Sequence, residues 1–147
     1  MINIFAKGID SLLVNLKEIE TRISNYSPLL NQVGKIELDE TRKRILQTKM
    51  SPNGTPWLPW APSTLAYRNK KGNASKGLLN DTGALLNSFK IIVKDKQVVV
   101  GTNLPYAKYL QDGTNKMPAR PFIGLPVKSQ ESVSILIDKY VGLPKGK

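Results

Sequence analysis

Apolar residues recur at intervals of three and four along the first fifty positions, which is the spacing of one face of an α-helix. The pattern predicts an amphipathic helix over residues 4–24 and a second over residues 28–48, with Pro28 in the first turn of the second helix. Residues 25–28 separate the two helices. Two arrangements remain open, a helical hairpin or one long rod bent at residues 26–28, and we expect the hairpin.

A change to strict alternation of apolar and polar positions marks a β-hairpin further along the chain. Residues 88–94 place Phe89, Ile91 and Val93 on one face, and residues 97–102 form a return strand that is rich in β-branched side chains. Because an isolated hairpin is only marginally stable, we expect helices on one face and further strands beside it. Residues 122–127 or a neighbouring subunit would supply those strands.

Shorter signals complete the secondary structure. A helical turn is predicted at residues 63–67, a short helix at 105–112 and a terminal helix at 129–141. The chain is therefore expected to be an α+β protein, in which a small antiparallel sheet built on a β-hairpin packs against N-terminal and C-terminal helices. We expect one domain over residues 1–147, with a helical part (1–50), a Pro/Gly-rich and basic loop (51–81) and a part with the hairpin and later helices (82–147).

Two loop segments carry side chains that invite a functional interpretation. Residues 51–62 hold four prolines together with Trp57 and Trp60. The rings form either an exposed binding platform or a seal on the core, and we favour the seal. Residues 68–77 are polar and basic, so we expect a mobile surface loop. Its cationic residues are candidates for an interface or for contact with DNA: Arg68, Lys70, Lys71 and Lys76.

Composition removes most catalytic chemistries. The chain has no Cys and no His, which excludes thiolate nucleophiles and Cys/His zinc sites and removes the usual general base. The acidic cluster at Glu37, Asp39 and Glu40 lies beside three basic residues at helical spacing, so surface ion pairs are expected there. We find no candidate catalytic, metal-binding or cofactor-binding residue.

The charge of the chain is strongly positive and unevenly distributed. Residues 1–40 carry a net −2 and residues 41–147 a net +13, giving a formal net charge of +11. The cationic part faces nucleic acid, an acidic protein or only solvent. Because no helix-turn-helix or finger motif is visible, the nucleic-acid alternative is a basic binding module without base-specific readout. No apolar run is long enough to predict a membrane span.

Six short motifs between Pro52 and Gly124 share their order with a known family. They are SPNGTPW at residues 51–57, PSTL at 62–65, LNDTGAL at 79–85, VGTN with YA at 100–107, QDG at 111–113 and ARPFIG at 119–124. Together they resemble the phage virion morphogenesis family, the tail-completion group that includes Mu-like G proteins. One difference is Leu110, where the family often has His.

The resemblance implies a structural, non-enzymatic protein without a cofactor. Such a protein would complete the tail or join the tail to the head, at the neck or tail end of the virion, after assembly in the bacterial host cytoplasm. Its expected partners are further copies of itself in a ring, with a hexamer favoured, the tail tube or terminator, and head connector proteins. Non-specific contact with phage DNA is a further expectation, and contact with a membrane is not expected.

The stretch over residues 101–122, which we call the corner, is then expected to be a structural element that turns the chain. Gly83 and Gly113 are expected to supply backbone turns, and Pro118 and Pro121 to fix the direction of the chain. Arg120 is a candidate for a bidentate salt bridge, either between subunits or within one chain. Phe122 is expected to anchor the core, and Tyr106 and Tyr109 to lie in the core or in an interface.

Overall fold

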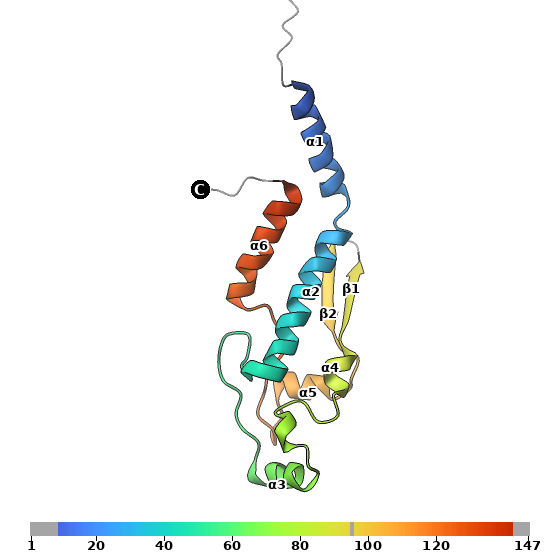
Figure 1. The fold of residues 1–147 in the computed structure, drawn as a ribbon. Coiled ribbons are helices and arrows are strands. Elements are labelled where there is room, and N and C mark those ends of the chain that lie inside the picture. The colour runs from blue at the N-terminus through green and yellow to red at the C-terminus, as the bar shows by residue number, and fades with distance from the viewer. Residues whose placement is uncertain (1–8, 95, 143–147) are drawn as a thin grey trace, which may run out of the picture.

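The computed structural model describes residues 9–94 and 96–142, and it has an elongated shape (Figure 1). Helix α1 (Ile9–Ser24) occupies one end, and α3 (Pro62–Lys70) occupies the other. Between them lie α2 (Ser27–Lys43), α4 (Ala84–Ser88), α5 (Ala107–Asp112), α6 (Val127–Val141) and a hairpin of β1 (Lys90–Lys94) and β2 (Gln97–Gly101). A π-helical turn (Arg44–Thr48) extends α2, and a 3₁₀ turn (Ala74–Lys76) follows α3. The α+β class with a small hairpin is confirmed.

Helices α1 and α2 run end to end (Figure 1), so the predicted helical hairpin is wrong and the bent rod is the observed arrangement. The break is too gentle to reverse the chain, because Tyr26 keeps right-handed helical angles (φ −75°, ψ −16°). Its carbonyl already accepts a hydrogen bond from the amide of Leu30. The neighbour of α1 is instead α6, whose Tyr140 hydroxyl donates to the carbonyl of Asn25 at 2.5 Å.

The antiparallel hairpin packs one face against α2. At Gly34 the helix and the sheet approach closely, since a Cβ at this position would lie 2.6 Å from Ile91 Cγ2 and 2.9 Å from Val98 Cγ2. The glycine that weakens the helix in isolation thus lets the helix rest on the sheet. On the opposite face, Ile92 and Val99 are register partners and are each 56% exposed.

The predicted further strand at residues 122–127 is not present: among the described residues the sheet contains β1 and β2 alone. Residues 121–124 instead run beside α5 and the end of α2, where side chains bind their backbone. A segment whose amides and carbonyls are already bonded in this way has no need of a strand partner.

The core lies below the hairpin, where the π-helical turn, α4 and α5 meet the loops. It is built from Ile45, Trp57, Leu85, Phe89, Ala107 and Phe122. Phe122 is 1% exposed, and its ring lies 5.9 Å from that of Phe89. The predictions that Trp57 seals the core and that Phe122 anchors it are confirmed. Trp60 is only half-buried.

The terminal helix α6 packs along α1 and α2. It begins two residues before its predicted start and ends at Val141, after which Gly142 adopts φ +82°. This left-handed residue accounts for the stop, because glycine adopts that conformation without strain. None of the helices in the described part of the chain has the length and hydrophobicity needed to span a membrane.

Candidate assembly corner

Residues 121–124 form an extended segment whose backbone is bound by side chains from distant parts of the chain. Trp57 Nε1 donates to the carbonyl of Pro121 at 3.0 Å. The amide oxygen of Gln111 accepts from the amides of Phe122 and Ile123, and its Nε2 donates to the carbonyl of Ile123. One glutamine therefore substitutes for a strand partner across two residues.

Arg44 and Glu37 bind the rest of this segment, so the predicted surface ion pair at Glu37 is wrong. Arg44 is 4% exposed and donates to the carbonyls of Phe122, at 2.6 Å, and Gly124. Glu37 accepts from the amide of Gly124 at 2.9 Å and lies 4.0 Å from Arg44. Burial lowers the pKa of Arg44, and the nearby carboxylates of Glu37 and Glu40 partly offset that effect.

Arg120 is buried, and among the described residues it makes no salt bridge within the chain, so the intrachain alternative is wrong and a bridge between subunits stays a prediction. Its Nε donates to the carbonyl of Leu58 and its terminal nitrogen to that of Pro59, both at 3.0 Å. The guanidinium thus clamps the Pro-rich loop onto the corner through carbonyl groups. Among the described residues no carboxylate lies within ion-pair distance of it, and burial lowers its pKa.

Gly113 supplies the turn at the other end of the corner, as the sequence predicts. It adopts φ +76°, and a Cβ there would lie 2.6 Å from the backbone nitrogen of Ala119. Gly83 also has a positive φ and precedes α4. The structure therefore confirms both turns, and at Gly113 the glycine is required by close packing as well as by conformation.

Arg68 does not belong to a mobile surface loop, because its side chain is buried. It forms an ion pair with Asp81 and donates to the carbonyls of Gly77, at 3.1 Å, and Asn80, at 2.9 Å. Its guanidinium also stacks 4.8 Å from the centre of the Trp60 ring. Arg68 therefore holds the segment after α3 in place and is withdrawn from the group of candidates for contact with DNA.

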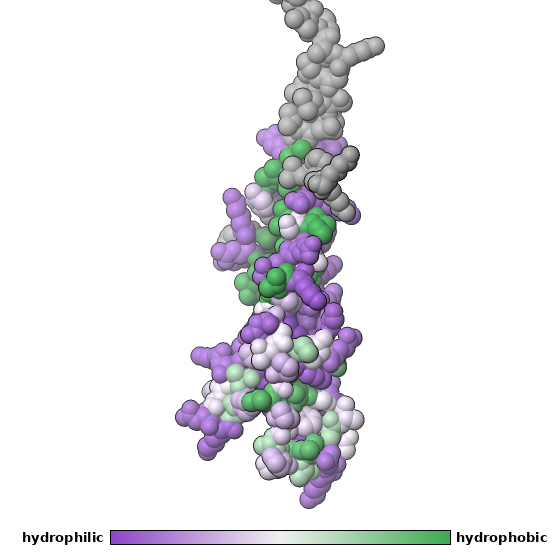
Figure 2. Space-filling model, turned by 90° about the vertical axis from the view of Figure 1, so that its left-hand side faces the viewer, coloured by the Kyte–Doolittle hydropathy of each residue, from purple (hydrophilic) through white to green (hydrophobic). Residues whose placement is uncertain are grey.

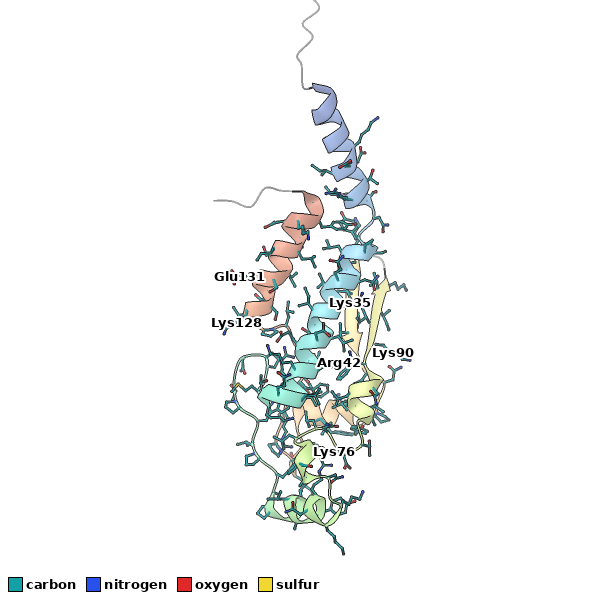
Figure 3. All side chains as sticks on the ribbon, in the orientation of Figure 1. Lys35, Arg42, Lys76, Lys90, Lys128 and Glu131 are labelled. Atoms are coloured by element: carbon teal, nitrogen blue, oxygen red, sulfur yellow. The ribbon has the colours of Figure 1, made fainter. Side chains whose placement is uncertain are left out.

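Lys70, Lys71 and Lys76 are exposed at the end of α3 or just after it, and Figure 3 shows Lys76 near that end of the molecule. Lys76 donates to the carbonyl of Asp81 at 3.2 Å, and the Lys71 ammonium lies 5.0 Å from the centre of the Tyr67 ring. Their charges are solvated, so these lysines remain available to an anionic partner.

Apolar side chains also reach the surface at several places. Tyr106 and Tyr109 of the corner are exposed, so neither lies in the core of this chain, and an interface role remains a prediction. On the side that carries α6, apolar patches alternate with hydrophilic surface (Figure 2). No group of three or more Asp, Glu, Cys or His side chains arranged to hold a metal ion occurs within the described ranges.

Comparison with known proteins identifies the family of this chain. A profile of the phage virion morphogenesis family matches residues 8–142, which is most of the chain. The chain belongs to the phage virion morphogenesis family. The Mu-like prophage FluMu G protein 1 of Haemophilus influenzae is 25% identical over 103 residues, covering 69% of this chain and 70% of that protein. No solved structure matches.

The structure gives physical roles to several of the six motifs by which this phage virion morphogenesis protein resembles its family. Trp57 and Gln111 each bind the 121–124 segment directly, and Gly113 shapes the turn between Gln111 and that segment. Arg44 and Glu37 contribute as much to the corner but lie outside the six motifs. Residues seven positions apart lie on the same face of a helix, and this spacing is the signal that would have placed Glu37 and Arg44 on one side of it.

Proposed function

We propose that this structural protein of the virion is not an enzyme but completes the phage tail or joins the tail to the head, as a ring at the neck with a hexamer favoured. The partners would be further copies of the chain, the tail tube or terminator, and head connector proteins. Membership of the family supports a role in the structure or assembly of the virion. The hairpin and its unpaired strand edges support the ring.

The observation that carries the proposal is a sheet with two open edges. Within the described residues, β1 and β2 pair only with each other, so each strand has backbone groups without a second strand partner. Open edges of this kind readily accept a strand from another chain. On the face away from α2, the Ile92–Val99 pair adds an exposed apolar surface beside these edges.

Pairing β1 of one copy with β2 of the next would use both edges of every copy. Such a head-to-tail contact is heterologous, and it closes into a ring when the rotation between copies divides a full turn. The α2 helices would then form a layer on one side of a continuous sheet, because each hairpin carries α2 on one face.

Assembly is expected to slow hydrogen exchange at specific amides. Lys94 and Gln97 face each other across a two-residue turn, so the amides of Ile91, Val93, Val98 and Val100 point away from the hairpin. In the ring, exchange at these four should slow by on the order of tenfold or more. Native mass spectrometry would give the number of copies, and exchange measured on the same sample would locate the contact.

The amides of Ile92 and Val99 provide the internal control, because they are bonded within the hairpin already. A ring in which the four outward amides still exchange freely would rule out edge pairing as the contact. A protein that stays monomeric and also fails to bind purified tails would contradict the ring itself. Electron microscopy of particles assembled without the protein distinguishes completion of the tail from joining of the tail to the head. Tails of irregular length would indicate a role in completion, whereas normal tails beside DNA-filled heads would indicate a role in joining.

Non-specific contact with phage DNA is a further part of the proposal. It is supported by the formal net charge of +11 and the exposed lysines near α3. Changing Lys70, Lys71 and Lys76 together to Gln is expected to weaken binding to duplex DNA equally for all sequences. The slope of log affinity against log salt should fall by roughly 2–3, about 0.9 for each phosphate that is no longer neutralised. Gel retardation over a range of salt concentrations measures both effects.

A matched control changes three exposed lysines far from α3, namely Lys17, Lys128 and Lys139, to Gln. The two triple variants have equal net charge, so a loss of binding specific to the first places the DNA near α3. Equal losses of DNA binding in the two variants would indicate that DNA is attracted by the net charge of the whole protein instead. Absence of DNA binding by the unmodified protein at low salt would remove DNA from the partners.

A further inference from the structure

A cavity of about 600 Å³ opens between α3, the segment that leads into α4, and the turn before Arg120. Its apolar walls include Trp60, Tyr67, Tyr106 and Met117. Both tyrosines are exposed, so their rings are accessible from solvent. The volume lies within the range of about 300–1,000 Å³ that is typical of ligand pockets, so the cavity has room for side chains of another molecule.

The charged groups around this cavity are unequal in number. Arg68, Arg120 and Lys116 line it together with a single carboxylate, that of Asp81, leaving two positive charges in excess. Asp81 is already paired with Arg68. The buried charge of Arg120 is met only by carbonyl groups among the described residues, and an uncompensated buried charge is costly.

We propose that the cavity is a docking site for a carboxylate-bearing segment of a partner protein, with an aromatic or apolar side chain next to the acidic group. The apolar group would pack between Trp60 and Tyr106, and the carboxylate would compensate Arg120 and Lys116. Duplex DNA fits the site poorly, because its phosphates lie on a convex surface whereas these cations line a concave one with aromatic walls. The site would serve a partner in the particle whether or not copies of the chain form a ring.

The smallest probe with the required chemistry is N-acetyl-L-phenylalanine, which carries one ring and one carboxylate. Its uncharged amide keeps the ring and loses the charge. With ¹³C-methyl methionine in the full chain, the Met117 methyl reports on the cavity, and the Met50 methyl, which is exposed elsewhere, serves as an internal reference. The acid should shift the Met117 signal saturably with a Kd of about 1 mM, as expected for a ligand of this size.

Two pairs of variants separate binding in the cavity from general effects. Thr64→Trp would fill the mouth of the cavity, whereas Ser63→Trp places the same ring on α3 outside it. Lys116→Glu reverses a charge in the lining, whereas Lys108→Glu makes the same change at an exposed position of α5 outside the lining. Thr64→Trp should abolish the shift and Lys116→Glu should weaken binding several-fold, and neither control should change it.

Three outcomes would overturn the proposal. The first is no saturable shift of Met117 up to about 20 mM acid. The second is equal affinity for the acid and its amide, which would make the cavity apolar without selection for a carboxylate. The third is binding of phenyl phosphate that is tighter than that of the acid, which would assign the site to a phosphate ligand. None of these measurements depends on ring formation, so the cavity and the ring can fail separately.

Discussion

Replacing Arg44 with Met is expected to lower the free energy of unfolding by about 3–5 kcal/mol, the cost of breaking a buried ion pair from one side. Methionine fills similar space but cannot donate to the carbonyls of Phe122 and Gly124, and it leaves Glu37 without its cation. A domain is stable by only about 5–15 kcal/mol, so the loss is a large share of the total. Urea unfolding followed by the fluorescence of Trp57 and Trp60 would measure it, since Trp57 binds the same segment.

Arg42→Met is the matched control, because Arg42 lies on α2 two residues before Arg44 but is exposed (Figure 3). It should change stability by no more than about 0.5 kcal/mol. Adding Glu37→Gln to Arg44→Met should recover part of the loss, since it removes the carboxylate left without a partner. If Arg44→Met costs no more than Arg42→Met, the two carbonyls must find other donors, and the side-chain anchoring of this segment would not hold the corner together.

The elements with strong local signals could be predicted from the sequence. The hairpin follows from alternation on both sides of a two-residue turn, and α6 follows from its apolar spacing and the glycine at its end. The start of α2 follows from Pro28. In each case residues close in sequence specify the structure, so no knowledge of distant contacts is needed.

The direction of α1 could not be predicted, because periodicity identifies the faces of a helix but not the angle to the next one. The outcome depends on the backbone angles of Tyr26 and on a contact with α6, more than a hundred residues later in the chain. The strand expected at residues 122–127 failed for a related reason. Apolar residues between prolines indicate extended backbone, but its partners there are side chains of Gln111 and Arg44.

Three arginines show most clearly which contacts could not be predicted from the sequence. Arg44, Arg68 and Arg120 are all buried, although composition suggests solvated surface charge. Their acceptors are mainly backbone carbonyls, which every residue carries and which leave no trace in the sequence. Arg44 binds a carbonyl 78 positions away and Arg120 one 62 positions away. The cavity could not be predicted for the same reason, since its walls come from four separate stretches of the chain, within residues 60–68, 79–85, 106–110 and 116–120.

Replacing Gly113 with Ala is expected to destabilise the protein by about 2–6 kcal/mol, by adding two separate costs. Its backbone conformation (φ +76°, ψ −179°) is adopted readily by glycine alone and costs an L-residue about 1–3 kcal/mol. The new methyl would also lie 2.6 Å from the backbone nitrogen of Ala119 and 3.0 Å from the Met117 carbonyl oxygen, and such overpacking costs about 1–3 kcal/mol. Backbone cannot move aside as a flexible side chain does, so Ala119 and the neighbouring Arg120 would have to shift.

Gly77→Ala separates the two costs, because Gly77 has nearly the same backbone conformation (φ +82°, ψ −176°) and an added Cβ there meets only the flexible end of the Lys49 side chain. It should therefore lose little more than the conformational part, about 1–3 kcal/mol. The difference between the two variants in urea unfolding measures the close packing at the corner. Equal losses would mean that Gly113 serves only as a turn. A larger loss for Gly113→Ala, together with a changed Met117 methyl shift, would show that the turn also positions Arg120 and one wall of the cavity.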